Sequence, residues 1–283
     1  MSKRTPMTQR IIAALALALM VFGGHVAASA AEGGPQVTPP SGLVARGKLT
    51  YGVAATFPPF EYHAEEGGLT GFDIEMMARL AEYMGLEPAP LDMDFDGLIP
   101  ALQGRRLDII NSAMYITPAR AEQVDFVPYL IIGEAIIVRA GNPRNIQELD
   151  DLCGKTVAVT RGAIGEVYMT DQAAVCQAKG LPRLNILALP TNQDAMLAVL
   201  QGQADAFDTS IPGAAHLQQQ RPGQFEVATT FELGTVIGIA VRKDDADMKR
   251  ALEEAMALLV ESGEFDELLR KYNLPLESSF FRN

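Results

Sequence analysis

The sequence predicts an α/β protein, because apolar strand patterns alternate with helical patterns along the chain. Residues 49–54 and 107–110 are typical of buried strands, and a turn follows each of them. Between these strands, residues 71–84 carry apolar side chains at helical spacing and end at Gly85. The chain of 283 residues is long enough for two compact lobes with substantial cores.

The other elements follow from the same signals. Buried strands are predicted at residues 157–160, 204–207 and 236–241. The remaining predicted helices are residues 97–103 before Gly104, the segment after the turn at 161–165, residues 192–202 capped by Asn192, a helix capped by Asp247 and stopped by Gly263, and residues 264–272.

The N-terminus reads as a cleavable export signal. Three basic residues precede the apolar stretch 11–22, and residues 28–30 read A-S-A, an A-x-A cleavage site. We expect cleavage after residue 30 and a periplasmic protein, because the apolar stretch is too short for a confident membrane span. Residues 31–46, rich in Gly, Pro and small polar residues, are predicted to form a flexible leader.

The charge balance narrows the set of partners. The formal net charge is −12, and removal of residues 1–30, which hold three basic and no acidic residues, makes it −15. Such a protein is a poor partner for nucleic acid or for anionic membranes. Two cysteines in an exported chain, Cys153 and Cys176, predict one disulfide. The sequence carries no metal-ligand pattern and no nucleotide or cofactor motif, so we expect neither a metal nor a cofactor.

The most specific signal lies at residues 95–126. This stretch reads F-D-G-L-I-P-A-L-Q-G-R-R-L-D-I-I-N-S-A-M-Y-I-T-P-A-R-A-E-Q-V-D-F. A buried strand is followed by a turn of small residues, which brings Thr117 and Arg120 to the carboxyl end of the strand, where open α/β sheets bind ligands. The planar fork of arginine suits a carboxylate. We therefore predict that Arg120 anchors a carboxylate of the ligand.

This stretch resembles the family-3 periplasmic solute-binding proteins, the polar amino-acid receptors of ABC importers. The shared pattern is F-D-x-L-I-P-x-L, D-x-I, I-T-x-x-R and D-F, and the motifs T-F-P-P-F at 56–60 and G-F-D-I at 71–74 match in the expected order. The resemblance covers about residues 49–272. It implies a two-lobed periplasmic-binding-protein fold with a hinge and a ligand cleft between the lobes.

In such a fold the first lobe is discontinuous. The resemblance implies that residues 47–132 and 236–283 form lobe 1 and that residues 133–235 form lobe 2. It also implies a monomeric, non-enzymatic receptor that captures a small carboxylate-bearing solute, an amino acid or a derivative. The lobes would close by hinge motion, and the closed form would dock on a membrane permease.

Two rival functions remain open. Some periplasmic dehydratases resemble these binding proteins, and such an enzyme needs a carboxylate in the cleft as general acid or base. Asp208 and Glu166 are the candidates for that role. The second rival is a sensory module that reports the ligand to a membrane receptor without import.

The resemblance assigns ligand contacts in lobe 1. Phe57 and Phe95 would sandwich the side chain or an attached cation of the ligand. The turn before the I-T-x-x-R motif, with Ser112, Ala113 and Tyr115, would add backbone and hydroxyl contacts. Tyr115 is larger than the residue usual at that point, so it narrows the pocket or adds a third aromatic wall.

Lobe 2 departs from the family pattern. Relatives commonly read G-T-T or G-S-T after the strand, whereas this chain has Gly162, Ala163 and Ile164, so backbone amides must hold the carboxylate there. Arg161 adjoins this turn and is a candidate second anion contact. The aspartates that commonly bind the α-ammonium group of the ligand are replaced by the residues Ala54 and Ser210.

These departures lead to a hypothesis about the ligand. A site without the usual partners should not select for a primary ammonium group. An aromatic cage could hold a betaine-like solute, or Arg120 with Arg161 could clamp a dicarboxylate. The conservative alternative is that Asp208 takes over the ammonium group and the ligand is an ordinary amino acid.

Overall fold

An eight-stranded mixed sheet runs through the part of the chain that the computed structural model describes, residues 34–282. The predicted signal peptide, residues 1–30, lies outside the described residues. The strands of the sheet, in spatial order, are β5 (Glu87–Asp92), β1 (Lys48–Val53), β6 (Ile109–Ile110), β11 (Phe225–Arg242), β7 (Val124–Arg139), β10 (Ala206–Ser210), β8 (Thr156–Thr160) and β9 (Asn185–Leu189). A small second sheet contains β2 (Thr56–Phe57), β3 (Glu61–His63) and β4 (Leu69–Thr70).

Eight α-helices accompany the strands in this part of the chain. They are α1 (Phe72–Tyr83), α2 (Leu98–Gln103), α3 (Pro118–Ala121), α4 (Ile164–Ala178), α5 (Asn192–Leu200), α6 (Ile211–Gln220), α7 (Ala246–Glu261) and α8 (Glu264–Lys271). No helix among the described residues is long and apolar enough to cross a membrane.

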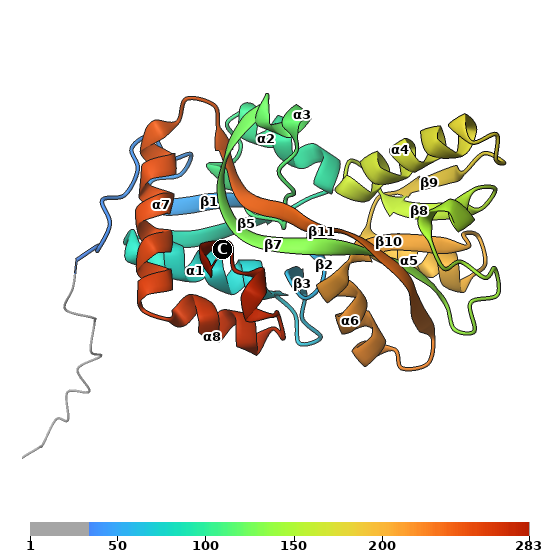
Figure 1. Ribbon diagram of the computed structural model, residues 1–283. Coiled ribbons are helices and arrows are strands. Elements are labelled where there is room, and N and C mark those ends of the chain that lie inside the picture. Colours follow the sequence, from blue (N-terminus) through green and yellow to red (C-terminus); the bar gives the residue numbers. More distant parts are fainter. Residues whose placement is uncertain (1–33, 283) are drawn as a thin grey trace, which may run out of the picture. The chain divides into compact units, whose positions relative to one another are not determined.

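Two long strands connect the two lobes of the fold. β7 and β11 pair antiparallel along most of their length and cross the middle of the molecule (Figure 1). The first lobe holds β1, β5, α1, α7 and α8, and the second lobe holds β8 to β10 and α4 to α6. The α/β class and the two-lobed architecture are therefore confirmed, while the residue boundaries of the lobes stay a prediction.

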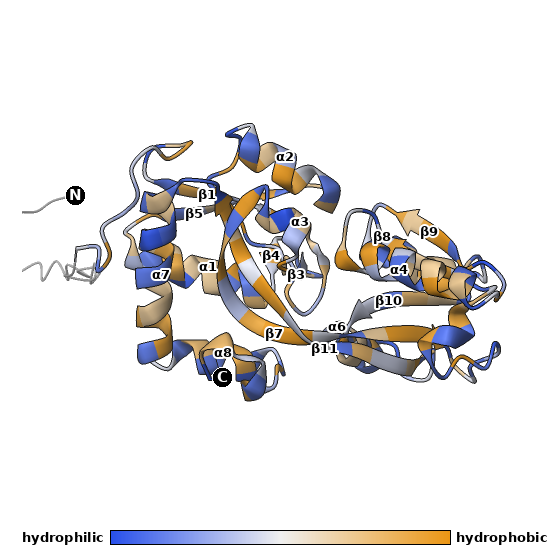
Figure 2. Ribbon diagram, turned by 45° about the horizontal axis from the view of Figure 1, so that its top comes forward, coloured by the Kyte–Doolittle hydropathy of each residue, from blue (hydrophilic) through white to orange (hydrophobic). Residues whose placement is uncertain are grey.

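Each lobe has hydrophobic packing of its own. In the first lobe, one face of α7 buries Met248, Leu252 and Leu259 in a cluster shared with α1 and β1. In the second lobe, β10 and α5 bury Phe207 and Val199 together. Figure 2 shows the apolar residues of β7 as the orange stretch of the crossing strand.

The boundaries of several elements differ from the sequence prediction. The helix expected to be capped by Asn192 is capped by Thr191, whose Oγ1 accepts from the backbone N–H of Asp194 at 3.0 Å. α7 is capped by Asp245 and not by Asp247, which lies in its first turn and pairs with Arg250. In both helices the prediction was wrong by one or two residues, because neighbouring residues were equally good caps.

Two strand predictions also needed correction, and one strand was missed. The strand expected at 204–207 is β10, which begins at Ala206 and continues to Ser210. The strand expected at 236–241 is only the end of β11, which has 18 residues. β5 was missed because its sequence E-P-A-P-L-D contains two prolines, which a strand tolerates at the edge of a sheet.

The predicted disulfide is confirmed. Cys153 follows a short 3-10 helix, Leu149–Leu152, and Cys176 lies near the end of α4, with a Cα–Cα distance of 5.6 Å. The segment predicted as a leader packs in part on the first lobe, since Val37 is buried and its N–H donates to the carbonyl of Tyr83 at 3.0 Å.

Candidate functional site

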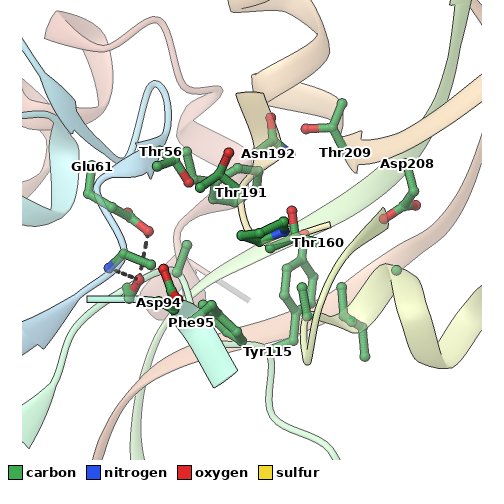
Figure 3. A pocket seen from close by; sticks show the side chains of 18 of the residues that line it. Thr56, Glu61, Asp94, Phe95, Tyr115, Thr160, Thr191, Asn192, Asp208 and Thr209 are labelled. Atoms are coloured by element: carbon green, nitrogen blue, oxygen red, sulfur yellow. Dashed lines mark hydrogen bonds between the residues drawn. The ribbon is translucent and has the colours of Figure 1, made fainter. Parts of the chain in front are cut away.

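A cavity of about 370 Å³ lies where the two lobes face each other. Its wall is built at the carboxyl ends of β1, β5 and β6 in the first lobe and of β8, β9 and β10 in the second. This is the edge of an α/β sheet at which ligands are expected. The lining includes Thr56, Phe57, Glu61, Asp92, Asp94, Phe95, Ser112, Ala113, Tyr115, Glu134, Thr160, Ala163, Ile164, Thr191, Asn192, Asp208 and Thr209 (Figure 3).

The lining is acidic. Five carboxyl groups face the cavity, and among the described residues that line it there is no Lys, Arg or His. Figure 3 shows Glu61 and Asp208 on opposite sides of the cavity. Three of the five, Glu61, Glu134 and Asp208, are buried. Buried carboxylates without a counter-charge are costly, so this cavity is suited to a ligand that supplies positive charge.

Glu134 and Asp208 form an acidic pair on the second-lobe side of the cavity. Glu134 lies in β7 directly opposite Ser210 of β10, and Asp208 lies two residues further along the same face. Both side chains are buried, and the two carboxyl groups are close enough to share a hydrogen bond. One oxygen of each, Oε1 of Glu134 and Oδ1 of Asp208, is buried without a hydrogen-bond partner among the described residues.

Burial changes the protonation of this acidic pair. Desolvation raises the pKa of Asp208 to about 7. Desolvation and the neighbouring charge of Asp208 raise the pKa of Glu134 well above its usual value. The hydroxyl of Tyr115, also buried and unpartnered among the described residues, interacts with Glu134.

The start of α4 leaves no free space beside Asp208. A Cβ atom at Gly165 would lie 1.9 Å from Oδ2 of Asp208 and 2.6 Å from its Cγ. The glycine therefore lets the carboxyl group lie against the first turn of the helix, where unpaired N–H groups and the helix dipole favour negative charge.

Glu61 forms the first-lobe side of the acidic lining. Its Oε1 accepts from Ser112 Oγ at 2.9 Å, and its Oε2 is buried without a partner among the described residues. Burial and the nearby Asp73 raise the pKa of Glu61 well above its usual value. Asp73 lies behind the cavity wall, where Tyr129 Oη donates to Oδ1 and Oδ2 of Asp73 at 2.9 and 2.8 Å.

The turn of small residues after β6 is held in a strained form. Ala113 has a φ of 39°, a left-handed value that is uncommon for a residue with a Cβ atom. Its N–H donates to Oδ2 of Asp73 at 2.8 Å, and Ser112 Oγ accepts from the N–H of Ala54 at 3.0 Å. These bonds fix the turn, so Ser112 and Ala113 line the cavity as the sequence predicted.

Arg120 is buried beside the cavity but does not line it. Its guanidinium donates to the carbonyl of Tyr115 at 2.8 Å and to the carbonyl of Gly162 at 2.8 Å. The guanidinium also lies 5.3 Å from the centre of the Phe95 ring, which does line the cavity. Burial lowers the pKa of Arg120 to about 10, so the group stays charged at neutral pH. Its role as carboxylate anchor stays a prediction.

Of the other predicted site residues, some line the cavity and some do not. Those that line it are Phe57, Phe95, Ser112, Ala113, Tyr115, Ala163, Ile164 and Asp208. Thr117 and Ser210 instead cap helices, with Thr117 accepting from Arg120 N and Ser210 accepting from Gly213 N. Arg161 is exposed, and Gly162 contributes its carbonyl to Arg120. The structure therefore does not bring Arg161 into the cavity with Arg120 as a double clamp.

Several lining residues were missed by sequence reasoning. Glu134 carried a usable signal, because it is a lone acid within the apolar run at 127–138 and is therefore buried at a cost. Thr160 ends β8, and Thr191 and Asn192 follow β9, so all three lie at carboxyl ends of strands, where polar residues are candidates for ligand contact.

Two lobes with an acid-lined cavity between them have the architecture of a ligand-binding protein. Residues 49–275 match the bacterial extracellular solute-binding proteins, family 3, and the chain belongs to this family. The match covers both lobes, so the family resemblance predicted from the sequence is confirmed.

Amino-acid-binding proteins stand among the relatives. The arginine-binding protein ArgT of Corynebacterium glutamicum is 29% identical over 84% of this chain and 78% of its own. The ABC transporter arginine-binding protein 1 of Escherichia coli is 28% identical over 92% of this chain and 97% of its own. These relatives support a substrate-binding role in amino-acid transport.

Solved structures agree with this assignment. An ancestral arginine-binding protein bound to arginine is 34% identical, with a TM-score of 0.74 over 80% of this chain and 98% of that chain. An ancestral amino-acid-binding protein described as a precursor of cyclohexadienyl dehydratase is 31% identical, with a TM-score of 0.71 over 80% of this chain and 96% of that chain.

Proposed function

We propose that this protein is the periplasmic receptor of an ABC importer and that it captures a basic amino acid of the arginine type. The observation that carries the proposal is the acidic cavity, in which Glu61 and the acidic pair offer unpartnered oxygens at opposite sides. Relatives named as arginine-binding proteins support the same ligand class.

The chemistry of the cavity matches a ligand with two cationic groups. One cationic group of the ligand would lie against Glu61 and the other against the acidic pair. Each would pair with carboxyl groups that no cationic side chain of the cavity lining neutralises. The rings of Phe57 and Phe95 line the space between and suit a planar guanidinium. A volume of about 370 Å³ is within the range of small-molecule sites.

The carboxylate of the ligand also needs hydrogen-bond donors from the protein. We retain Arg120 for this role, since a guanidinium has five N–H donors and two of them bond Tyr115 and Gly162. Ile164 adds a backbone N–H group at the first turn of α4, whereas the N–H of Ala163 donates to the carbonyl of Thr160 at 3.1 Å. Both lobes would then contact one ligand, and its binding would favour their closed arrangement.

A thermal-shift screen tests the proposal. Purified protein is heated with L-arginine, L-lysine, L-glutamine, glycine betaine or glutarate. A ligand at 100 times its Kd adds about 2.7 kcal/mol of stability. We expect the largest shift with L-arginine or L-lysine. The proposal is wrong if betaine or glutarate stabilises the protein and the basic amino acids do not.

The enzymatic alternative has one structural point in its favour. Asp208 has a pKa near 7 and faces the cavity, as a general acid would. Glu166, the other candidate, is bonded to Gly162 N at 2.7 Å and does not line the cavity. Incubation with prephenate or arogenate tests this alternative, and we expect no aromatic product.

A further inference from the structure

The acidic pair occupies the position at which the family pattern lost its ammonium partner. Ser210 stands where the resemblance led us to expect an aspartate, and its hydroxyl is used to cap α6. Glu134 lies directly opposite Ser210 on the neighbouring strand, and its side chain lines the cavity. The carboxylate missing from β10 is therefore supplied from β7, next to Asp208.

No described cation neutralises the acidic pair. Tyr115, from the turn after β6, and Tyr168, from α4, are the other titratable groups that interact with it, and both are neutral at physiological pH. Glu232 of β11 adds a further negative charge near Tyr168. Arg120 interacts with the two tyrosines, and its guanidinium points at backbone carbonyls of Tyr115 and Gly162.

We propose that Glu134 and Asp208 share one proton in the free protein and that the cationic group of the ligand displaces it. Two buried carboxylates in contact cannot both ionise without a counter-charge, so one proton stays between them. When an ammonium or guanidinium group enters, it supplies the positive charge, and the proton leaves to solvent. This inference rests on the proposed cationic ligand, and it adds Glu134 as a residue that determines specificity.

The direction of the pH dependence follows from the linkage. Asp208 ionises first, with a pKa of about 7, and its charge raises the pKa of Glu134, so Glu134 keeps the shared proton after Asp208 has lost its own. Below about pH 7 the free site holds a second proton on Asp208, and the cation lowers the pKa of both groups on binding. Ligand affinity should therefore rise as pH increases from 5 to 7, by about tenfold or more per unit, and should keep rising above pH 7 with a smaller slope until Glu134 loses its proton. A solute without a cationic group would show no such rise.

Calorimetry measures the displaced proton directly. Binding of L-arginine is recorded at pH 6 in buffers with different ionisation enthalpies, and the dependence of the heat on the buffer gives the number of protons released. We expect at least one proton per ligand at pH 6, where Asp208 also holds a proton in the free site. Binding with no proton release at pH 6 would overturn the inference and leave the proposed function intact. Absence of arginine binding would reject the proposed ligand instead, and the infrared measurement below would still decide the protonation.

Infrared spectroscopy assigns the proton without any ligand. The free wild-type protein should show the carbonyl stretch of a protonated carboxylic acid, and this band should titrate near neutral pH. The band should be reduced in the double variant Glu134→Gln with Asp208→Asn, or in Asp208→Asn if the double variant does not fold, and protonated Glu61 and Asp73 should account for the band that remains. The matched control is Asp73→Asn, which alters the buried carboxyl behind Glu61. If Asp73→Asn removes the band and the double variant keeps it, the proton belongs to the other side of the cavity and the inference is wrong.

Discussion

Substitution of Gly165 by alanine tests whether the position of the Asp208 carboxyl group decides ligand binding. Gly165 lies in the first turn of α4 with an ordinary helical backbone, so alanine should be accepted by the helix and even favoured by up to about 1 kcal/mol. The three heavy atoms nearest to the added Cβ, at 1.9, 2.6 and 3.1 Å, all belong to the side chain of Asp208. The substitution therefore changes the site without removing a single polar atom.

The size of the effect follows from the geometry. The added Cβ would lie 1.9 Å from Oδ2 of Asp208, whereas real Cβ contacts stay above 3.0 Å, so the carboxyl group must move by about 1 Å. Asp208 has a short buried side chain and cannot move that far while keeping its place in the cavity wall. Loss of one partner from a buried charged contact costs roughly 2–5 kcal/mol, so the affinity for L-arginine should fall by about 30-fold or more.

Isothermal titration of the wild type and two variants supplies the assay. Gly97→Ala is the matched control, because its added Cβ meets no atom within 4 Å and its residue does not line the cavity. We expect wild-type affinity in Gly97→Ala, weak binding in Gly165→Ala, and similar melting temperatures without ligand in all three proteins. Wild-type affinity in Gly165→Ala with an intact fold would refute the role given to Asp208.

Three further outcomes are expected. Arg120→Ala should weaken ligand binding by about 30-fold or more, and Arg120→Lys should rescue it poorly because it lacks the planar fork; unchanged calorimetric affinity would reject the anchor. Replacement of Cys153 and Cys176 by serine should lower the free energy of unfolding by about 3 kcal/mol, as measured in urea, because the disulfide closes a loop across 23 positions. Without ligand, the free energy of unfolding of the wild type should fall as pH rises from about 4 to 7. Burial raises the pKa of Asp73 and of Asp208 to about 7, so over this range both groups hold a proton in the folded protein that they have lost in the unfolded chain. A slope of the opposite sign in pH-dependent melting would contradict this prediction.

The sequence predicted the first lobe better than the second. The turn after β6 could be recognised because the small residues Ser112 and Ala113 separate a buried strand from the helix start at Thr117. β7 could not be recognised as one strand, since it is buried on both faces and its run V-D-F-V-P-Y-L-I-I-G-E-A-I-I-V-R lacks the alternation that marks a half-exposed strand. Its central part was read as a crossing between lobes.

The spacing of residues in the sequence could not predict where the charged side chains point. Arg120 was placed at the correct loop, but only the structure shows that its guanidinium bonds the carbonyls of Tyr115 and Gly162. Glu134 entered no sequence argument, because its relation to Asp208 depends on the register of two strands more than 70 positions apart. Register between distant strands is set by packing and is not visible in local sequence.

The buried carboxyl groups of this protein differ in how well their hydrogen bonds are satisfied, and this difference points to the functional ones. Asp73 receives hydrogen bonds from Tyr129 and from the N–H of Ala113, so its carboxyl group belongs to the structure of the cavity wall. In the acidic pair, Oε1 of Glu134 and Oδ1 of Asp208 have no hydrogen-bond donor among the described residues, although such donors would make the free protein more stable. A fold that keeps such a cost at the edge of a cavity gains from it only when a ligand brings the missing positive charge. Ligand binding then relieves the desolvation cost that the free protein carries at these carboxyl groups, and this relief contributes to the binding free energy. We therefore assign selectivity to the acidic pair and not to Asp73, whose hydrogen bonds are already made.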